Sequence, residues 1–293
     1  MSVRARFGPM KNAHSLAGAK VAKTRWPAEI AHWFFLIVLV FCLHSAVAKP
    51  FYIASESMMP VLLKGDQLVV SKYPYGWSWV SPSFYVAPRS EGRLFGRMPK
   101  RGDIVILTPR DRNIDYIKRV IGLPGDTIEI VAGQLYLNNQ AVPRQRSAPV
   151  RIPVDANAPC DGSLEQYRVS IDGRLYCELP VYRETLPGGR TYNTIDLGYN
   201  PDIDDYAKIT VPEGEVFLMG DNRDQSADSR VSSAAKGLGG PVPWENVGGR
   251  AEFITFSLNG TSRWLNPISW FTAMRGGRAG SSLHPHQDAA ARL

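Results

Sequence analysis

The sequence predicts a mainly β fold, in which an antiparallel β-sheet domain with an inserted β/loop subdomain follows one N-terminal transmembrane helix. Three observations carry this prediction. Residues 30–48 form an apolar run without Asp, Glu, Lys or Arg. Beyond residue 50, short strand-like runs are separated by Gly and Pro. The same region holds no long amphipathic helix pattern, which favours antiparallel barrels or sandwiched sheets.

Length and charge indicate a folded protein that does not bind nucleic acid. The chain has 293 residues, of which 44% are hydrophobic and 21% charged, enough to bury a core. The formal net charge is +7, but residues 1–28 hold six Lys or Arg and no acidic residue. Only one positive charge therefore remains for residues 29–293, too little for a basic binding face.

The apolar run predicts a membrane-spanning helix over residues 29–48. Nineteen residues at about 1.5 Å each cover about 28 Å, close to the thickness of the hydrocarbon core. The basic tail at 1–28 places the N-terminus in the cytoplasm by the positive-inside rule, so the rest of the chain lies across the membrane.

A removable secretory signal peptide is the alternative interpretation of this run. Ala46-Val47-Ala48 has the small-x-small pattern of a cleavage site, and cutting there would leave a chain that starts at Lys49. The run is longer than the usual apolar region of a signal peptide and its basic leader is long, so we favour an uncleaved anchor.

Strand patterns recur through the body and turn residues such as Pro-Gly-Asp at 124–126 separate them. The predicted strands are Gln67–Ser71, Ile104–Leu107, Tyr116–Ile121, Thr127–Val131, Gln134–Leu137, Glu215–Met219 and Ala251–Phe256.

Changes in composition divide the body. A stretch rich in Pro, Asp, Asn and Tyr predicts an inserted subdomain, and a final Gly- and Ala-rich stretch with little to bury predicts disorder. Between them, a Trp-rich segment fits either core packing or an interfacial membrane contact. The expected parts are a main β domain at 49–137 and 208–260, the insertion at 138–207, the possible interfacial segment at 261–275 and the disordered tail at 276–293.

The three cysteines fall into two groups. Cys42 lies inside the predicted membrane helix and cannot pair with the others. Cys160 and Cys177 lie in the exported part, where an oxidising compartment permits a disulfide worth about 3 kcal/mol for such a loop. We expect this pair to be bonded.

The histidines limit the chemistry. No histidine lies between Lys49 and Leu283, which excludes a Ser-His-Asp triad and the usual zinc sites from the body. We expect no metal and no cofactor. A catalytic base would have to be a carboxylate, Lys or Tyr.

Lys118 is the lysine that strand alternation singles out. In the stretch 114–126, Ile114, Tyr116, Lys118 and Val120 fall on one face of a strand. A lysine in such an apolar row either snorkels at an edge or is buried with a lowered pKa, which would keep it neutral and basic near pH 7. Most of the other six lysines of the exported part stand beside Gly, Pro or charged residues, as solvated lysines do.

Two serines follow the apolar run in an extended segment. Ser55 and Ser57 alternate with other residues, so both hydroxyls share one face, and apolar residues follow that would exclude water. Without other evidence, the simpler interpretation is that both are ordinary serines of a linker.

The polar segment 220–230, GDNRDQSADSR, allows three interpretations: a solvated turn, a calcium loop or a buried charged network. A calcium loop needs Gly and Glu where this chain has Ser229 and Ala235, so it is rejected. The S-x-x-K match at Ser233–Lys236 lacks its usual partner motifs and is treated as chance.

In this order, the segments resemble the type I signal peptidase (leader peptidase) family of membrane-anchored serine proteases with a Ser-Lys dyad. The matching blocks are SESMMPVLLKGD at 55–66, RGDIVIL at 101–107, DYIKRVIGLPGD at 115–126 and GDNRDQSADSR at 220–230. The chain departs from the family at Val61, where Thr is usual, and after Arg230, where residues 231–243 look like an insertion.

The resemblance assigns roles to single residues. It implies Ser57 as nucleophile, Lys118 as general base, Ser55 with the Ser57 N–H as oxyanion hole, and Ser226 as the serine that orients the lysine. It also implies a structural ion pair and substrate pockets. The pair is Asp228 and Arg230, and the pocket residues are Phe51, Ile53, Met58, Leu62, Tyr116 and Ile117.

The function implied is removal of N-terminal signal peptides after A-x-A motifs, with exported preproteins and the lipid bilayer as partners. The implied location is a bacterial-type inner membrane, crossed once, with the catalytic domain outside the cytoplasm. Two alternatives remain: a pilin or conjugation peptidase of the same chemistry, and a non-catalytic anchored binding or assembly protein. A Ser-Lys self-cleaving repressor is disfavoured by the apolar run and by the lack of a DNA-binding domain.

Overall fold

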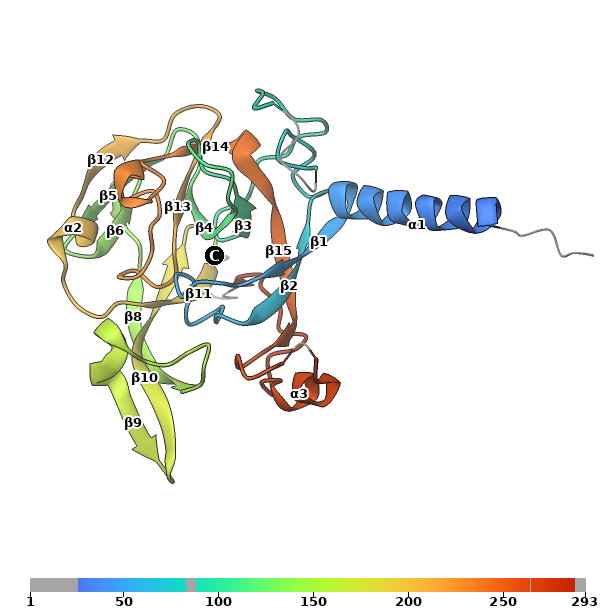
Figure 1. Ribbon diagram of the computed structural model, residues 1–293. Coiled ribbons are helices and arrows are strands. Elements are labelled where there is room, and N and C mark those ends of the chain that lie inside the picture. The colour runs from blue at the N-terminus through green and yellow to red at the C-terminus, as the bar shows by residue number, and fades with distance from the viewer. Residues whose placement is uncertain (1–25, 83–87, 264, 288–293) are drawn as a thin grey trace, which may run out of the picture. The chain divides into compact units, whose positions relative to one another are not determined.

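The strands expected from alternation are all present in the computed structural model, which describes residues 26–82, 88–263 and 265–287. Most of the basic tail at 1–28, Trp264 of the possible interfacial segment and residues 288–293 lie outside this part. The predicted strand bounds differ from the observed ones by four residues at most, and the observed strands form three sheets (Figure 1).

The largest sheet carries the matching blocks of the sequence. Its seven strands, given in spatial order and with antiparallel neighbours, are β1 Ala48–Tyr52, β2 Asp66–Ser71, β15 Val247–Ser257, β3 Ile104–Leu107, β4 Tyr116–Gly122, β13 Glu215–Met219 and β14 Val242–Pro243. Strand β1 stands at one end of this order, so one of its edges is open. The register pairs Lys118 with Val105 and Arg119 with Ile104.

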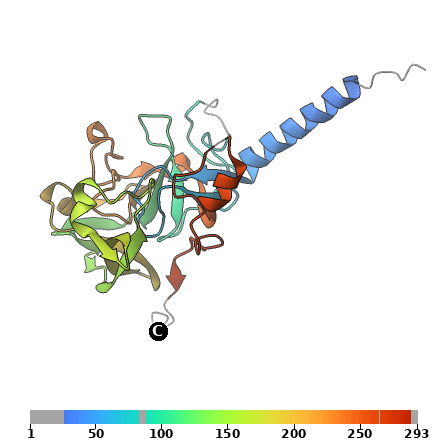
Figure 2. The ribbon, with the colours of Figure 1, turned by 60° about the horizontal axis from the view of Figure 1, so that its bottom comes forward.

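Two smaller sheets complete the body. One has four strands, β12 Tyr206–Thr210, β5 Thr127–Val131, β6 Gln134–Leu137 and β7 Gln140–Ala141. The other has five, β16 His286–Gln287, β11 Arg190–Ile195, β10 Arg174–Leu186, β8 Arg144–Pro153 and β9 Arg168–Ile171, and its yellow-green strands gather at the left of Figure 2. Residues 144–195 thus form a sheet within the predicted insertion, whereas β7 and β12 at its ends pair into the four-stranded sheet. The division into domains at 137/138 and 207/208 stays a prediction.

Helices are few in the described part of the chain. Helix α1 spans Trp26–Ala46, and its window Ala28–Ala46 is long and apolar enough to cross a membrane by length and composition. Helix α1 therefore starts three residues before the predicted start at residue 29. It ends two residues before the predicted end at residue 48, because Ala48 begins β1. The remaining helical segments are short: α2 Pro201–Asp204, α3 Pro267–Thr272, and the 3-10 turns Gly162–Tyr167, Ser233–Ala235 and Trp244–Asn246.

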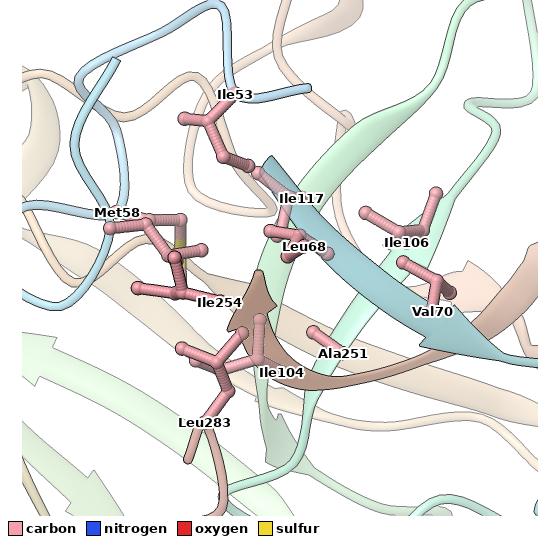
Figure 3. Packing of buried hydrophobic residues seen from close by; sticks show 11 residues of the cluster. Ile53, Met58, Leu68, Val70, Ile104, Ile106, Ile117, Ala251, Ile254 and Leu283 are labelled. Carbon is pink, nitrogen blue, oxygen red and sulfur yellow. The ribbon is translucent and has the colours of Figure 1, made fainter. Parts of the chain in front are cut away.

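The core beneath the first strands is built from both ends of the body's sequence. Ile53 and Met58 from the loop after β1 pack with residues of β2, β3, β4 and β15 (Figure 3). Leu283, which is 3% exposed, joins the same cluster from the C-terminal segment. Burial of such side chains stabilises the fold by roughly 1.5–3 kcal/mol each.

The prediction of a disordered tail from residue 276 is wrong for residues 276–287. Arg278 forms an ion pair with buried Asp66 and donates to the carbonyl of Val61 at 3.0 Å. The N–H of Leu283 donates to the carbonyl of Glu252, and β16 pairs with β11. Together these contacts fix this otherwise Gly- and Ser-rich segment to the body.

The segment 261–275 exposes its apolar side chains. Leu265 is 86% and Phe271 72% exposed, whereas core packing would bury them. Of the two interpretations, core packing is therefore wrong for these residues, and the interfacial contact stays a prediction. Ala273 is the buried exception.

Candidate active site

Ser57 lies in a turn that follows β1 and is held from several sides. The N–H of Ile53 donates to the carbonyl of Asp66, and the N–H of Gly65 donates back to the carbonyl of Ile53, which closes the loop that carries the serine. The side chain of Asp66 accepts from the N–H of Leu63 at 2.8 Å. Ser57 is 5% exposed, so the predicted linker position is a rigid, buried one.

Lys118 reaches this serine from β4. Its Nζ donates to Ser57 Oγ at 2.9 Å and to the carbonyl oxygen of Ile117 at 3.0 Å. The residue is 4% exposed, so the structure answers the question that alternation left open: Lys118 is buried and does not snorkel. Two residues 61 positions apart in sequence thus form a serine–lysine pair.

Burial changes the acid–base behaviour of this lysine. The pKa of Lys118 is lowered from 10.5 to about 8, chiefly by desolvation; the positive charge of Arg230 contributes to this lowering, and the negative charges of Asp228 and Asp221 oppose it. An amine with a pKa near 8 is neutral in a usable fraction of molecules at neutral pH. It can therefore accept the proton of a hydroxyl that lies within hydrogen-bond distance.

The groups expected around a developing oxyanion lie beside the pair. Ser55 Oγ stands 3.3 Å from Ser57 Oγ, within hydrogen-bond distance. The N–H of Ser57 donates to no other group in the described part of the chain, which leaves it able to donate to a substrate oxygen. Both predicted donors are therefore close to the nucleophile.

Ser226 is placed less simply than expected. It is 5% exposed and close to the turn, since a Cβ added at Gly220 would lie 2.1 Å from Ser226 Oγ and 2.5 Å from the carbonyl oxygen of Ser57. Yet Lys118 Nζ bonds to Ser57 Oγ and to the carbonyl oxygen of Ile117, not to Ser226 Oγ, so the expected bond between Ser226 and Lys118 is not formed in this structure. Its role in orienting the amine stays a prediction.

The polar segment 220–230 is the buried charged network, not a solvated turn. Arg230 and Asp228 pair at 2.9 Å with both side chains buried, as predicted. Burial alone would raise the pKa of Asp228, but the charge and hydrogen bonds of Arg230 outweigh it and lower that pKa. The same carboxylate accepts from the N–H of Gly220 at 2.9 Å, which fixes the segment next to Ser57.

Two further buried ion pairs were missed by the sequence analysis. Arg119, next to the base, binds both oxygens of Asp221 at 2.7 and 2.6 Å. Arg223 binds Glu184 of β10 at 2.6 Å, and Tyr192 donates to the same carboxylate. Arg119 follows Lys118 directly in sequence, but nothing local in sequence identified its partner.

A cavity of about 550 Å³ opens over the serine–lysine pair. Four of the six predicted pocket residues line it, namely Phe51, Ile53, Tyr116 and Ile117. Met58 and Leu62 are not among the residues that line it; both are buried in the core below the turn, and their assignment to the substrate pockets stays a prediction. Lys236 of the predicted insertion at 231–243 also lines the cavity, which the sequence did not indicate.

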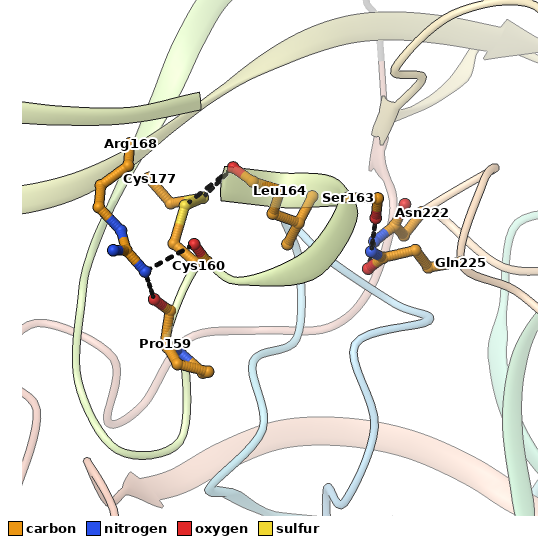
Figure 4. The surroundings of a disulfide bond; sticks show 8 residues. All are labelled: Pro159, Cys160, Ser163, Leu164, Arg168, Cys177, Asn222 and Gln225. Carbon is orange, nitrogen blue, oxygen red and sulfur yellow. Dashed lines mark hydrogen bonds between the residues drawn. A yellow bond between two sulfur atoms is a disulfide. The ribbon is translucent and has the colours of Figure 1, made fainter. Parts of the chain in front are cut away.

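The cysteines are placed as expected. Cys160 and Cys177 form a disulfide with a Cα–Cα distance of 5.6 Å, and Cys42 is free and exposed. Figure 4 shows the bond beside the 3-10 turn that carries Ser163 and Leu164. Among the residues described, no cluster of His, Cys, Asp or Glu is suited to a metal ion.

Comparison with known proteins places these features in a family. Residues 28–256 match the family described as "Signal peptidase, peptidase S26". The chain is 35% identical to the signal peptidase I of Rickettsia massiliae (strain Mtu5) over 257 residues, which is 85% of each chain. It is 36% identical to that of Rickettsia akari (strain Hartford) over the same length and coverage. A crystal structure of a signal peptidase I from Enterococcus faecalis V583 aligns over 53% of this chain and 97% of that one, with 23% identity and a TM-score of 0.27. The chain belongs to the signal peptidase family, peptidase S26.

Proposed function

We propose that the protein is a membrane-anchored endopeptidase that removes N-terminal signal peptides from exported preproteins after small-x-small motifs, using Ser57 and Lys118 as a catalytic dyad. The observation that carries this proposal is the 2.9 Å hydrogen bond between Lys118 Nζ and Ser57 Oγ, with both residues buried at the base of a cavity. Relatives named signal peptidase I, at 35% identity over most of the chain, supply the substrate class.

The substrate enters as an extended strand. Strand β1 ends the seven-stranded sheet, and residues 51–55 continue along the cavity, so a peptide can form main-chain hydrogen bonds at this edge. Phe51, Ile53, Tyr116 and Ile117 narrow the cavity with apolar groups. Small side chains one and three positions before the cut fit there, and larger ones are excluded.

The chemistry then proceeds in two transfers. Neutral Lys118 takes the proton of Ser57 Oγ as that oxygen attacks the scissile carbonyl, and Ser55 and the Ser57 N–H stabilise the oxyanion. Lys118 gives the proton to the leaving amine, which frees the mature protein. It next activates a water molecule that hydrolyses the acyl-enzyme and releases the signal peptide.

The location follows from helix α1 and the charge of the tail. The helix window is long and apolar enough to span a bilayer, and six basic residues precede it. We therefore place the N-terminus in the cytoplasm and the body outside it, at a bacterial-type inner membrane, where exported preproteins emerge.

The test is cleavage of a preprotein whose signal peptide ends in Ala-x-Ala by the full chain in detergent micelles. Ser57→Ala and Lys118→Met should each abolish cleavage while thermal unfolding stays cooperative, and Lys64→Met, an exchange outside the cavity, should leave cleavage unchanged. Substantial cleavage by either dyad variant would overturn the assignment.

Two alternatives predict different results. A pilin or conjugation peptidase would cleave only its own class of precursor, so a panel of preproteins separates it from a general processing enzyme. A non-catalytic binding protein would retain preproteins without cutting them, and the wild type would then be inactive on the whole panel.

A further inference from the structure

Asn222 touches both peptide groups that flank the nucleophile. Its backbone N–H donates to the carbonyl oxygen of Ser57 at 3.1 Å, and its side-chain Nδ2 donates to the carbonyl oxygen of Glu56 at 3.2 Å. The residue is fully buried. It does not contact the hydroxyl of Ser57, so its effect on the site runs through the backbone.

The bond to Glu56 fixes the direction of a different group. The carbonyl of Glu56 and the N–H of Ser57 belong to one peptide unit, which is planar and trans, so the two point in opposite directions. Holding the carbonyl with Nδ2 therefore holds the N–H of Ser57. That N–H is the backbone donor assigned to the oxyanion under the proposed function.

The side chain of Asn222 is itself held by hydrogen bonds that lead to a 3-10 turn of the predicted insertion. Nδ2 also donates to Gln225 Oε1 at 3.0 Å, and Gln225 Nε2 donates to Ser163 Oγ at 2.8 Å (Figure 4). Ser163 lies in the 3-10 turn next to the disulfide cysteine Cys160. A chain of hydrogen bonds thus runs from the disulfide-linked turn to the nucleophile's peptide.

The backbone of Asn222 is fixed by its neighbours. The N–H of Ile195 in β11 donates to the carbonyl of Asp221, and the N–H of Arg223 donates back to the carbonyl of Ile195, both at 2.9 Å. These two bonds clamp the peptide groups on either side of Asn222. The side chain therefore starts from a rigid point and cannot adjust freely when the turn moves.

Stability alone does not explain this side chain. Its Oδ1 is buried without a hydrogen-bond partner in the described part of the chain, which costs stability. Rotating the Asn222 carboxamide by half a turn would not give Oδ1 a donor, because Oδ1 would then face the backbone carbonyl oxygen of Glu56 and the side-chain oxygen Oε1 of Gln225. A buried group kept in a half-satisfied state points to a role in function.

We propose that Asn222 is a positioning residue for the oxyanion hole: its carboxamide aims the Ser57 N–H at the oxygen of the scissile carbonyl. This inference rests on the proposed function and adds a residue to it. An N–H aimed correctly binds the oxyanion of the transition state more strongly than the flat carbonyl of the substrate, so its loss lowers kcat and leaves KM nearly unchanged.

The experiment compares Asn222→Ala with the wild type, as full chains in detergent micelles, on a preprotein whose signal peptide ends in Ala-x-Ala. Removing an oxyanion donor outright costs about 100- to 1,000-fold in kcat, so misaiming one should cost roughly 10- to 100-fold. We expect this fall in kcat, a KM within threefold of wild type, and an unmoved apparent pKa in the pH profile of kcat/KM, because Lys118 keeps its surroundings.

Asn157→Ala is the matched control. Its Nδ2 also donates to a backbone carbonyl, that of Leu258 at 2.8 Å, but away from the cavity, so this variant should keep the wild-type kcat. Gln225→Ala is the second test variant, for the case that Asn222→Ala fails to fold. It keeps the Asn222 amide and removes one of its supports, and its kcat should fall about threefold or more; because Gln225 also lines the cavity, kcat and not KM is the readout for this variant.

A kcat of Asn222→Ala within twofold of wild type would overturn the inference. So would a raised KM with unchanged kcat, a shifted apparent pKa, or, if Asn222→Ala is unfolded, a wild-type kcat for Gln225→Ala. The proposed function fails on different evidence, namely an inactive wild type or an active Ser57→Ala.

Discussion

Replacing the buried base should make the protein more stable, by an amount that depends on pH. Burial lowers the pKa of Lys118 from 10.5 to about 8, a difference that corresponds to about 3 kcal/mol at about 1.4 kcal/mol per pKa unit. Below pH 8 the lysine is protonated in both states, and the folded state carries the full cost of the buried charge. Between pH 8 and 10.5 the unfolded chain binds the proton more tightly than the folded one, so the cost is relieved as pH rises.

Lys118→Met removes this cost at every pH and keeps most of the side-chain volume. It also removes the hydrogen bonds to Ser57 Oγ and to the carbonyl oxygen of Ile117, a loss of about 1 kcal/mol each. At pH 6–7 we therefore expect Lys118→Met to exceed the wild type by about 1 kcal/mol in the free energy of unfolding. The difference should shrink, and reach zero or change sign, as pH approaches 10.

The assay is denaturant unfolding of the full chain in detergent micelles, followed by tryptophan fluorescence at several pH values between 6 and 10. Ser57→Ala is the control, because it keeps the buried lysine and should follow the pH dependence of the wild type. A Lys118→Met protein that is less stable than wild type at pH 7 would refute the reasoning. A stability difference that does not change with pH would refute it equally.

Two further predictions concern the frame of the site. Reducing the Cys160–Cys177 disulfide, or changing Cys160→Ser, should cost about 3 kcal/mol of stability, measured as a lower Tm. The control Cys42→Ser should not change Tm, because Cys42 is free. Equal Tm values for the two variants would contradict the stabilising role of the disulfide. Gly220→Ala should abolish cleavage, because the added Cβ would lie 2.5 Å from the carbonyl oxygen of Ser57, whereas Gly276→Ala, where no atom lies within 4 Å, should remain active. An active Gly220→Ala would show that the turn can move.

The strands of the fold were predictable because alternation is a local signal. Ile104–Leu107 and Gln134–Leu137 were assigned to the residue. The packing of the C-terminal segment was not predictable, because it depends on contacts between residues far apart in sequence. Nothing near Leu283 or Arg278 indicates that one fills the core under Ser57 and the other binds Asp66.

The site was predictable where a residue was unusual in its own strand, as Lys118 is. Lys72 shows the limit of this reasoning. It follows the last residue of β2, and its neighbours in sequence do not mark it as buried, yet it is 3% exposed and donates to the carbonyl oxygen of Ser81. Burial lowers its pKa to about 8 as well, but it lies outside the cavity that holds Ser57. Burial alone therefore does not identify the base; the hydroxyl within reach does.

Apolar residues near the nucleophile were the hardest to assign. Met58 and Ile53 look equally suited to a pocket wall in sequence, and both pack in the core cluster below the turn, but of the two only Ile53 also lines the cavity. Which side a side chain takes depends on the path of the turn, and that path is set by partners such as Asn222 that lie 165 or more residues away. Pairings of this kind, including Arg119 with Asp221, are properties of the tertiary structure.

The role of Lys118 as the catalytic base is tested most directly by the pH dependence of kcat/KM for cleavage of a preprotein that carries an Ala-x-Ala motif. If buried Lys118 is the base, activity must rise with pH as the amine loses its proton, with an apparent pKa near 8. An acid limb near 10.5, where an exposed lysine titrates, or a profile with no acid limb, would contradict the role of Lys118 as a neutral buried base.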